Sequence, residues 1–165
     1  MTKKLKVLVI RFSSIGDIVL TTPVLRCINS QLNVSIDFLT KDKYKPLLAA
    51  NTDIEKLILL SNNISQTIKA LRANKYDMII DLHNNLRSFR IRKALNTQSF
   101  TMSKYSLKRF ILIYFGVDLL KNHIVDRYFE TVKSIGVYND NEGISYTLSP
   151  TTKADFNINQ DYIAW

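Results

Sequence analysis

Short apolar runs alternate with segments of helical periodicity along most of this chain. The first run, residues 5–10 (LKVLVI), is almost wholly apolar, which is typical of a strand buried on both faces of a parallel sheet. Residues 18–32 instead repeat apolar side chains every three or four positions, which predicts an amphipathic helix. Because Pro23 lies inside that segment, we expect a kink there, or a helix that truly begins near Thr21 and Thr22.

The same alternation continues as far as Gly136, where the last long helix is expected to end. Further strands are predicted at residues 34–39, 54–60, 76–82, 99–102 and 144–148. Further helices are predicted at residues 43–50, 64–74, 86–95, 107–115 and 124–135. Strands and helices that alternate through short joints form right-handed βαβ units, so we expect an α/β fold with a Rossmann-like, doubly wound and mainly parallel sheet.

The chain's 165 residues suffice for one domain with its own core. Its composition changes after Ser149: residues 150–160 are polar and typical of a linker, and residues 161–165 (DYIAW) resemble the start of another strand. We therefore expect one domain at residues 1–149, followed at residues 150–165 by a linker and the start of a second domain. The single cysteine, Cys27, excludes an internal disulfide and indicates a small core residue in a reducing, cytoplasmic setting.

The charge of the chain favours an anionic partner. Lys and Arg number 23 against 14 acids, a formal net charge of +9, and no acid lies between Leu82 and Val117. Such a stretch attracts phosphate groups, acidic sugars, lipid headgroups or nucleic acid. The alternative is a solvated basic face without a partner. No apolar run is long enough to cross a membrane, and no secretory signal is recognisable.

Two predicted strands end in clusters of polar residues, at positions 11–17 and 81–87. Doubly wound sheets bind ligands beyond the carboxyl ends of their strands, where the winding reverses, so the two clusters face one cleft if both strands flank that point. In the first cluster, Gly16 would allow a tight turn and close approach of a ligand, while Ser13 and Ser14 would cap backbone N–H groups or bind the ligand. The glycine patterns of dinucleotide-binding and P-loop proteins are absent.

Asp17 has two interpretations at the start of the predicted helix. As a helix-start residue it would be stabilised by the helix dipole and remain ionised. Alternatively, it faces the cleft as a general base that takes a proton from a bound hydroxyl group.

Three segments resemble one enzyme family. RFSSIGDIVLTTPVLR, residues 11–26, closely resembles the N-terminal signature of the bacterial heptosyltransferases, glycosyltransferase family 9. YDMIIDLHNNLRS, residues 76–88, and HIVDRYFETVKSIG, residues 123–136, resemble two further segments of that family and follow in the same order. The resemblance covers most of residues 5–136.

The resemblance implies the N-terminal half of a two-domain GT-B glycosyltransferase. That half would bind the acceptor, the lipopolysaccharide inner core, while the absent half binds a nucleotide sugar, ADP-heptose; alone, the chain would be inactive. Asp17 would be the general base of an inverting, metal-independent transfer that needs no cofactor. The predicted acceptor-binding residues are Arg11, Ser13, Ser14, Gly16, His83, Asn84, Arg87, His123 and Arg127.

Several of these residues have simpler alternatives. Arg11 could simply be a surface residue at the end of a strand. His83 could satisfy local backbone groups, and His123 could be a residue at the end of a helix. His83 and Asn84 also replace the glutamine and glycine often found in the family at this point. The two histidines match no metal-ligand spacing, so we expect no metal site.

The basic stretch is expected to contact the anionic surface of the inner leaflet, which would place the protein in the cytoplasm, peripheral on the inner membrane. The residues predicted for this contact are Arg90, Arg92, Lys93, Lys104, Lys108 and Arg109. The apolar helix at residues 107–115 would lie near the membrane or pack in the core. An alternative function is a basic Rossmann-like module that binds anionic lipid or nucleic acid without catalysis; nucleic acid is not expected, because most aromatic residues fall on apolar helix faces.

Overall fold

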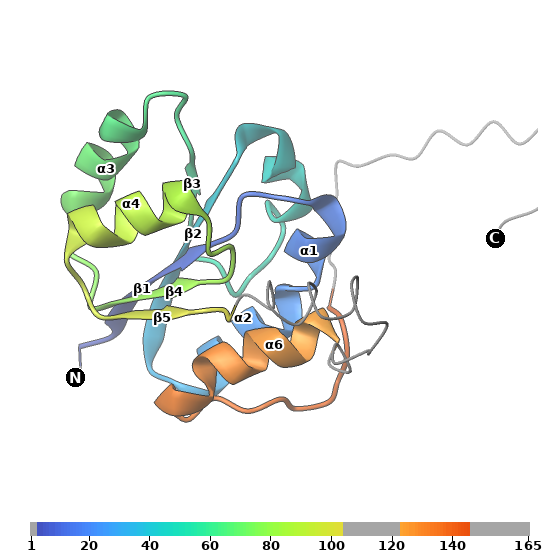
Figure 1. The fold of residues 1–165 in the computed structure, drawn as a ribbon. Helices are drawn as coiled ribbons and strands as arrows, with labels where there is room; N and C mark the ends of the chain where they lie inside the picture. The colour runs from blue at the N-terminus through green and yellow to red at the C-terminus, as the bar shows by residue number, and fades with distance from the viewer. Residues whose placement is uncertain (1–2, 104–122, 146–165) are drawn as a thin grey trace, which may run out of the picture.

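A computed structural model of the chain describes residues 3–103 and 123–145, which form strands and helices in alternation (Figure 1). The strands are β1 (Leu5–Ile10), β2 (Val34–Thr40), β3 (Lys56–Leu59), β4 (Met78–Asp81) and β5 (Ser99–Thr101). The α-helices are α1 (Ile15–Val19), α2 (Thr22–Gln31), α3 (Ile64–Arg72), α4 (Leu86–Leu95) and α6 (Ile124–Val132). Two 3₁₀ helices, η1 (Asp42–Leu47) and η2 (Lys133–Ile135), complete the described elements.

The five strands form one parallel sheet in the order β3-β2-β1-β4-β5. The chain begins in the middle at β1, winds outward to β3, and then crosses to β4 on the other side of β1. The winding therefore reverses between β1 and β4, where Val9 lies opposite Ile80. The expected α/β fold with a Rossmann-like parallel sheet is confirmed.

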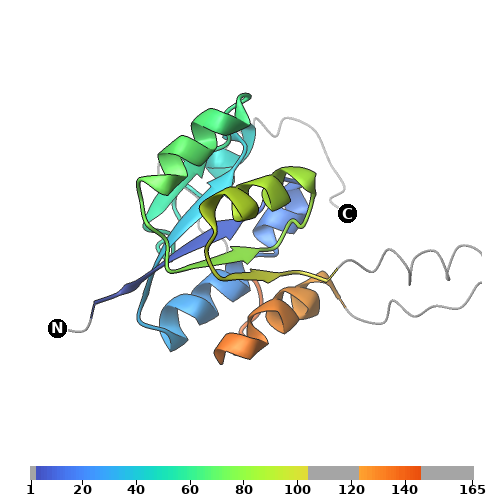
Figure 2. The ribbon, with the colours of Figure 1, turned by 60° about the vertical axis from the view of Figure 1, so that its left-hand side comes forward.

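Helices cover both faces of the sheet. Helices α3 and α4 lie on one face, and α2 and α6 lie on the other (Figures 1 and 2). Alternate residues of β1 therefore enter different cores: Val7 and Val9 pack on the side of α2 and α6, and Leu8 and Ile10 on the side of α3 and α4. Cys27 is fully buried in the first of these cores, as its sequence context predicts.

The single helix expected at residues 18–32 is instead two helices. The short α1 begins at Ile15, before the predicted start, and α2 begins at Thr22 with Pro23 in its first turn. Between them the Thr21 hydroxyl donates a hydrogen bond to the carbonyl of Ile18 at 2.6 Å, and the Thr22 hydroxyl donates one to the carbonyl of Val19 at 2.9 Å. The late true start near Thr21 and Thr22 is confirmed.

Other boundaries differ by a few residues. Strands β3 and β4 are shorter than predicted, and η1 is a 3₁₀ helix in place of the α-helix expected at residues 43–50. Helix α4 has the predicted bounds, and Gly136 ends η2 with a φ of +82°, as expected of a glycine at a helix end. Ile144 and Ser145 are not in a strand. Outside the described residues lie Lys104, Lys108, Arg109, the predicted helix at 107–115 and residues 150–165.

Candidate active site at the carboxyl edge of the sheet

The loops after β1 and β4 lie side by side, as predicted from the position of the two polar clusters. Nη1 of Arg11 donates a hydrogen bond to the carbonyl oxygen of Leu82 at 2.5 Å. One residue further along each loop, the rings of Phe12 and His83 meet edge to face with their centroids 4.9 Å apart. The two segments are 71 residues apart in sequence, and these contacts join them at the point where the winding reverses.

The Asp17 carboxylate is held through one of its two oxygens. Oδ2 accepts hydrogen bonds from the backbone N–H and the hydroxyl of Ser14, at 3.0 and 2.8 Å, and lies 2.6 Å from Nη2 of Arg11. Within residues 3–103 and 123–145, Oδ1 has no recorded partner. The Asp17 side chain is 31% exposed, so a ligand from outside the chain can approach this carboxylate.

The surroundings of Asp17 keep its carboxyl group ionised. Partial burial by itself raises the pKa of Asp17, but the hydrogen bonds from Ser14 and the positive charge of Arg11 outweigh it, so the pKa lies below its ordinary value. The helix-start interpretation is thus correct for the local structure, since Ser14 and Asp17 form the N-terminal cap of α1. It is compatible with the general-base interpretation, because capping occupies only Oδ2.

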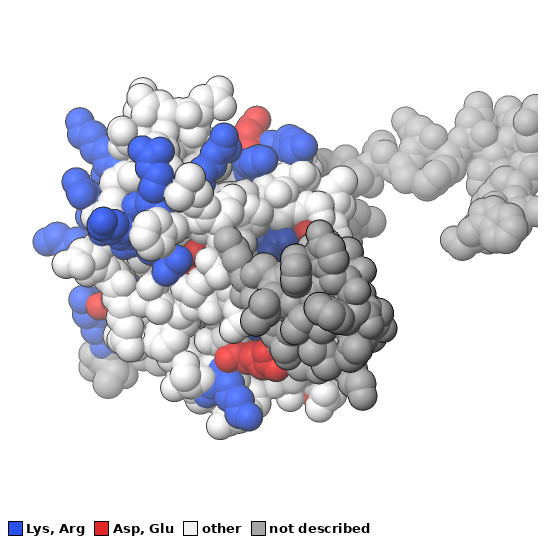
Figure 3. All heavy atoms as spheres, in the orientation of Figure 1, with Lys and Arg blue, Asp and Glu red and all other residues white. Residues whose placement is uncertain are grey.

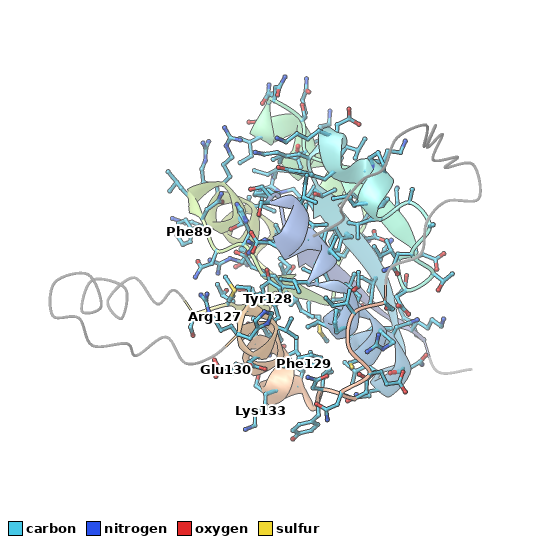
Figure 4. The ribbon with its side chains drawn as sticks, turned by 90° about the vertical axis from the view of Figure 1, so that its right-hand side faces the viewer. Phe89, Arg127, Tyr128, Phe129, Glu130 and Lys133 are labelled. Atoms are coloured by element: carbon cyan, nitrogen blue, oxygen red, sulfur yellow. The ribbon has the colours of Figure 1, made fainter. Side chains whose placement is uncertain are left out.

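Arg11 is buried, so the alternative that made it a surface residue is wrong. Only 7% of the residue is exposed, and its guanidinium group lies 5.7 Å from the ring centre of Tyr128 on α6. The Tyr128 hydroxyl in turn donates a hydrogen bond to the backbone carbonyl of Asp17 at 3.3 Å. Figure 4 shows Tyr128 pointing inward from α6. Burial raises the pKa of Tyr128 to about 12, which keeps this hydroxyl a neutral donor.

Asp81, the last residue of β4, binds the backbone of the loop that follows this strand. It is fully buried, and its Oδ1 accepts hydrogen bonds from the backbone N–H groups of His83 and Asn84 at 3.0 and 2.8 Å. Its other oxygen forms an ion pair with Nε of Arg92 at 2.8 Å. Asn84 has a φ of +47° and donates from its amide group to the carbonyl of Met102 at 2.7 Å. The loop is therefore fixed by Asp81 through its backbone and by Met102 through the side chain of Asn84.

His83 is an uncharged imidazole at neutral pH. Burial, followed by the nearby charge of Arg11, lowers the pKa of His83 to about 4. Its buried Nδ1 has no hydrogen-bond partner among the described residues, so this nitrogen does not satisfy a local backbone group, as one alternative expected of the ring. The charge of Lys41, the residue after β2, also lowers this pKa, which places a third loop near His83.

The other predicted residues lie around this centre with differing roles. Ser13 makes no recorded hydrogen bond to the described part of the chain, and Arg87 is exposed. His123 caps α6, where its Nδ1 accepts a hydrogen bond from the N–H of Val125 at 3.4 Å, as the helix-end alternative expected. Arg127 donates to the carbonyl of Ser103 at 2.7 Å. Roles for these residues in binding an acceptor stay predictions.

Gly16 and Arg92 differ from what the sequence led us to expect. Gly16 lies in α1 without a positive φ, and a Cβ built there would meet no atom within 4 Å, so the tight turn expected of it is wrong. The open space above it fits the other expectation, close approach of a ligand. Arg92 was expected on the anionic-contact surface, but its side chain turns inward to Asp81 and is only 17% exposed.

Sequence reasoning gave no individual role to three residues of this centre: Lys41, Asp81 and Tyr128. Asp81 and Tyr128 lie inside the segments that carry the family resemblance, and an acid that ends a buried strand is itself a signal of tertiary pairing. No comparable signal marks Lys41. Among the described residues, no group of three or more His, Cys, Asp or Glu side chains could hold a metal ion.

The chain is similar in sequence to curated heptosyltransferases. It is 29% identical over 111 residues to lipopolysaccharide heptosyltransferase 1 of Campylobacter coli, which covers 63% of this chain and 32% of that protein. It is 36% identical over 78 residues to lipopolysaccharide heptosyltransferase 3 of Escherichia coli strain K12, which covers 41% of this chain and 23% of that protein. The matches thus span a third or less of those relatives. No family model matches the chain.

Solved structures of the same kind share the fold. A glycosyltransferase of family 9 from Veillonella parvula has a TM-score of 0.69 at 20% identity, over 88% of this chain and 45% of that one. The E. coli heptosyltransferase WaaC with ADP has a TM-score of 0.60 at 20% identity, over 85% of this chain and 50% of that one. The resemblance to glycosyltransferase family 9 stated from the three sequence segments is therefore confirmed.

Proposed function

We propose that this chain is the acceptor-binding half of an inverting heptosyltransferase, which transfers heptose from ADP-heptose to the inner core of lipopolysaccharide. The observation that carries the proposal is the state of Asp17: an ionised carboxylate, one oxygen of which is unengaged by the described residues, at the point where the sheet reverses its winding. The similarity to lipopolysaccharide heptosyltransferases supports the choice of sugar and acceptor.

In the proposed reaction, an acceptor hydroxyl donates a hydrogen bond to Oδ1 of Asp17. The hydroxyl oxygen attacks the anomeric carbon of the heptose while the bond from that carbon to the diphosphate breaks on the opposite face, so that the configuration inverts. The hydroxyl proton passes to Asp17, and the bonding electrons leave with ADP. Arg11 and Ser14 hold Oδ2 throughout, which fixes the direction in which Oδ1 points.

Charged and polar groups beside Asp17 would orient the acceptor. The exposed guanidinium of Arg87 suits a two-pronged contact with a carboxylate or phosphate, and Lys41 adds a second positive charge near His83. His83 would act as a neutral hydrogen-bonding group, in agreement with its low pKa. We place the ADP-heptose site outside residues 1–149, because no glycine-rich phosphate loop follows β1.

The test is an Asp17→Asn substitution in the complete enzyme that contains this chain. We expect kcat to fall about a hundred- to ten-thousand-fold, the usual contribution of a general base, while acceptor binding stays nearly unchanged. Glu55→Gln is the matched control, because Glu55 is exposed and precedes β3 at the opposite end of the sheet. Near-normal turnover by the Asp17→Asn enzyme would remove Asp17 from the role of base. Acceptor binding without any transfer by the unaltered enzyme would favour the non-catalytic binding module.

A further inference from the structure

The charged residues of helices α3 and α4, which form one layer of the described fold, are all basic. Neither Ile64–Arg72 nor Leu86–Leu95 contains an acidic residue. In Figure 3 the basic side chains gather over these two helices. The exposed basic residues of the layer are Lys69, Arg72, Arg87, Arg90 and Lys93. On the opposite layer, α6 combines acids and bases, and Arg26 of α2 is paired with Asp140, so the two described helix layers differ in charge.

Two large apolar side chains lie exposed within this basic layer. Leu86 is 75% exposed and Phe89 is 48% exposed. Figure 4 shows Phe89 pointing outward from α4. Arg90 and Lys93 follow Leu86 by four and seven positions, a spacing that places all four side chains on one side of the helix. The inward side is made by Ser88 and Ile91, which are fully buried. Neither Leu86 nor Phe89 is needed to close the core beneath α4.

We propose that this α3–α4 face docks on an anionic lipid bilayer, with Leu86 and Phe89 inserted at the boundary between headgroups and acyl chains. A helix side that combines bulky apolar residues with Lys and Arg binds such a boundary, because the apolar groups leave water while the cations meet lipid phosphates. Leu86 is also the first residue of α4 and follows the loop of His83, so docking brings the candidate site to the headgroups. The biological purpose, access to a lipid-borne acceptor, rests on the proposed function; the docking itself does not.

The same surface is less suited to nucleic acid. Single-stranded nucleic acid binds through a succession of aromatic rings on which neighbouring bases stack. On the described α3–α4 face, Phe89 is the single exposed aromatic ring, and the guanidinium of Arg92 lies 5.6 Å from its centre. Arg92 is itself paired with Asp81, which leaves it poorly placed to bind a phosphate. Charge and apolar exposure together therefore favour a lipid surface.

The first test measures vesicle binding by flotation of the 165-residue chain. We expect binding to vesicles of equal parts phosphatidylglycerol and phosphatidylethanolamine, little binding to phosphatidylcholine vesicles, and weakening from 0.1 to 1 M salt as the Debye length falls from about 10 to about 3 Å. The double variant Arg90→Glu/Lys93→Glu should lose more than about tenfold in partition, since each basic residue contributes about fivefold. Its control, Lys4→Glu/Lys133→Glu, changes the net charge equally but away from the face and should lose far less.

The second test locates the inserted residues. Because the only cysteine, Cys27, is buried, a Leu86→Cys variant has one accessible thiol for a polarity-sensitive dye. The dye emission should shift to the blue with anionic vesicles, and the same dye on a Lys133→Cys variant should not respond. Equal losses in both charge-reversed variants, equal shifts in both labelled variants, or preferential binding of single-stranded RNA over the vesicles would each overturn the proposal. Transfer to a deacylated, water-soluble acceptor needs no membrane, so its presence or absence tests the proposed function separately.

Discussion

The ion pair between Arg11 and Asp17 should be detectable as a large coupling free energy. Replacing Arg11 by Met removes a buried cation that contacts both Asp17 and the carbonyl of Leu82. Replacing Asp17 by Asn keeps the shape of the side chain but leaves Arg11 buried without its counter-ion. Because each change removes the same attraction, the double variant should lose that attraction only once.

The size of the coupling follows from the geometry. Two unit charges about 4 Å apart attract by about 1 kcal/mol in bulk water and by about 4 kcal/mol at an effective dielectric constant of about 20. The Arg11 side chain is 8% exposed and that of Asp17 is 31% exposed, so the pair lies between these limits. We expect a coupling of about 2 kcal/mol, with losses of about 3 kcal/mol for Arg11→Met, about 2 for Asp17→Asn and about 3 for both together.

Urea unfolding of the 165-residue chain at pH 7 measures these free energies. The comparison requires that the unaltered chain, the two single variants and the double variant show the same slope of unfolding free energy against urea concentration. The Arg26–Asp140 pair is the matched control, with contacts of 2.7 and 2.8 Å. Its arginine side chain is 18% exposed, against 8% for Arg11, so Arg26→Met and Asp140→Asn should show weaker coupling. Losses at Arg11 and Asp17 that add within about 0.5 kcal/mol would refute the inference that the two side chains form one unit.

Two further predictions concern the β4 loop. Because the folded protein lowers the pKa of His83 to about 4, the unfolded chain binds a proton first as the pH falls. The free energy of unfolding should therefore decline from about pH 6.5 toward pH 4, by no more than about 1.4 kcal/mol per pH unit. His83→Gln should remove this part of the slope in urea titrations, and an unchanged slope would contradict the assignment. Asp81→Asn should lower the free energy of unfolding by about 3 kcal/mol, because it leaves Arg92 without its partner. Asp42→Asn, at an exposed position, should change the same free energy by less than about 0.5 kcal/mol. Equal effects of the two substitutions would show that the buried pair contributes nothing.

Local sequence patterns predicted the elements but not the pairings between them. The strand at Leu5–Ile10 and the helix at Leu86–Leu95 have the predicted bounds, because each is a strong, uninterrupted pattern. The division between α1 and α2 was only half predicted: Pro23 marks where a helix can begin, but the hydroxyl bonds of Thr21 and Thr22 that end the preceding helix leave no periodic trace.

The site shows the same limit for charged residues. A lone cation at a strand end has the sequence signature of a surface residue, and Arg11 is buried because Asp17 and a carbonyl 71 positions away receive it. Arg92 similarly belongs to a basic helix by sequence but turns inward to Asp81 on the preceding strand. Which charges are satisfied internally is decided by tertiary contacts. The docking face consequently depends on Arg90 and Lys93, and Arg92 adds little to it.

The pairing with Arg11 affects the proposed base in two opposite ways. It lowers the pKa of Asp17, which weakens the carboxylate as a proton acceptor, and it also keeps that carboxylate ionised and fixes its orientation. A weak base suffices when the proton moves late, because the acceptor hydroxyl becomes far more acidic once its oxygen has begun to bond to the anomeric carbon. The orientation of the Asp17 carboxylate then matters more than its basicity. The two hydrogen bonds from Ser14 and the ion pair with Arg11 fix that orientation, because all three contacts are made to Oδ2. Tyr128 extends this arrangement, since it contacts both the guanidinium of Arg11 and the backbone of Asp17, so α6 helps to determine where the free oxygen points.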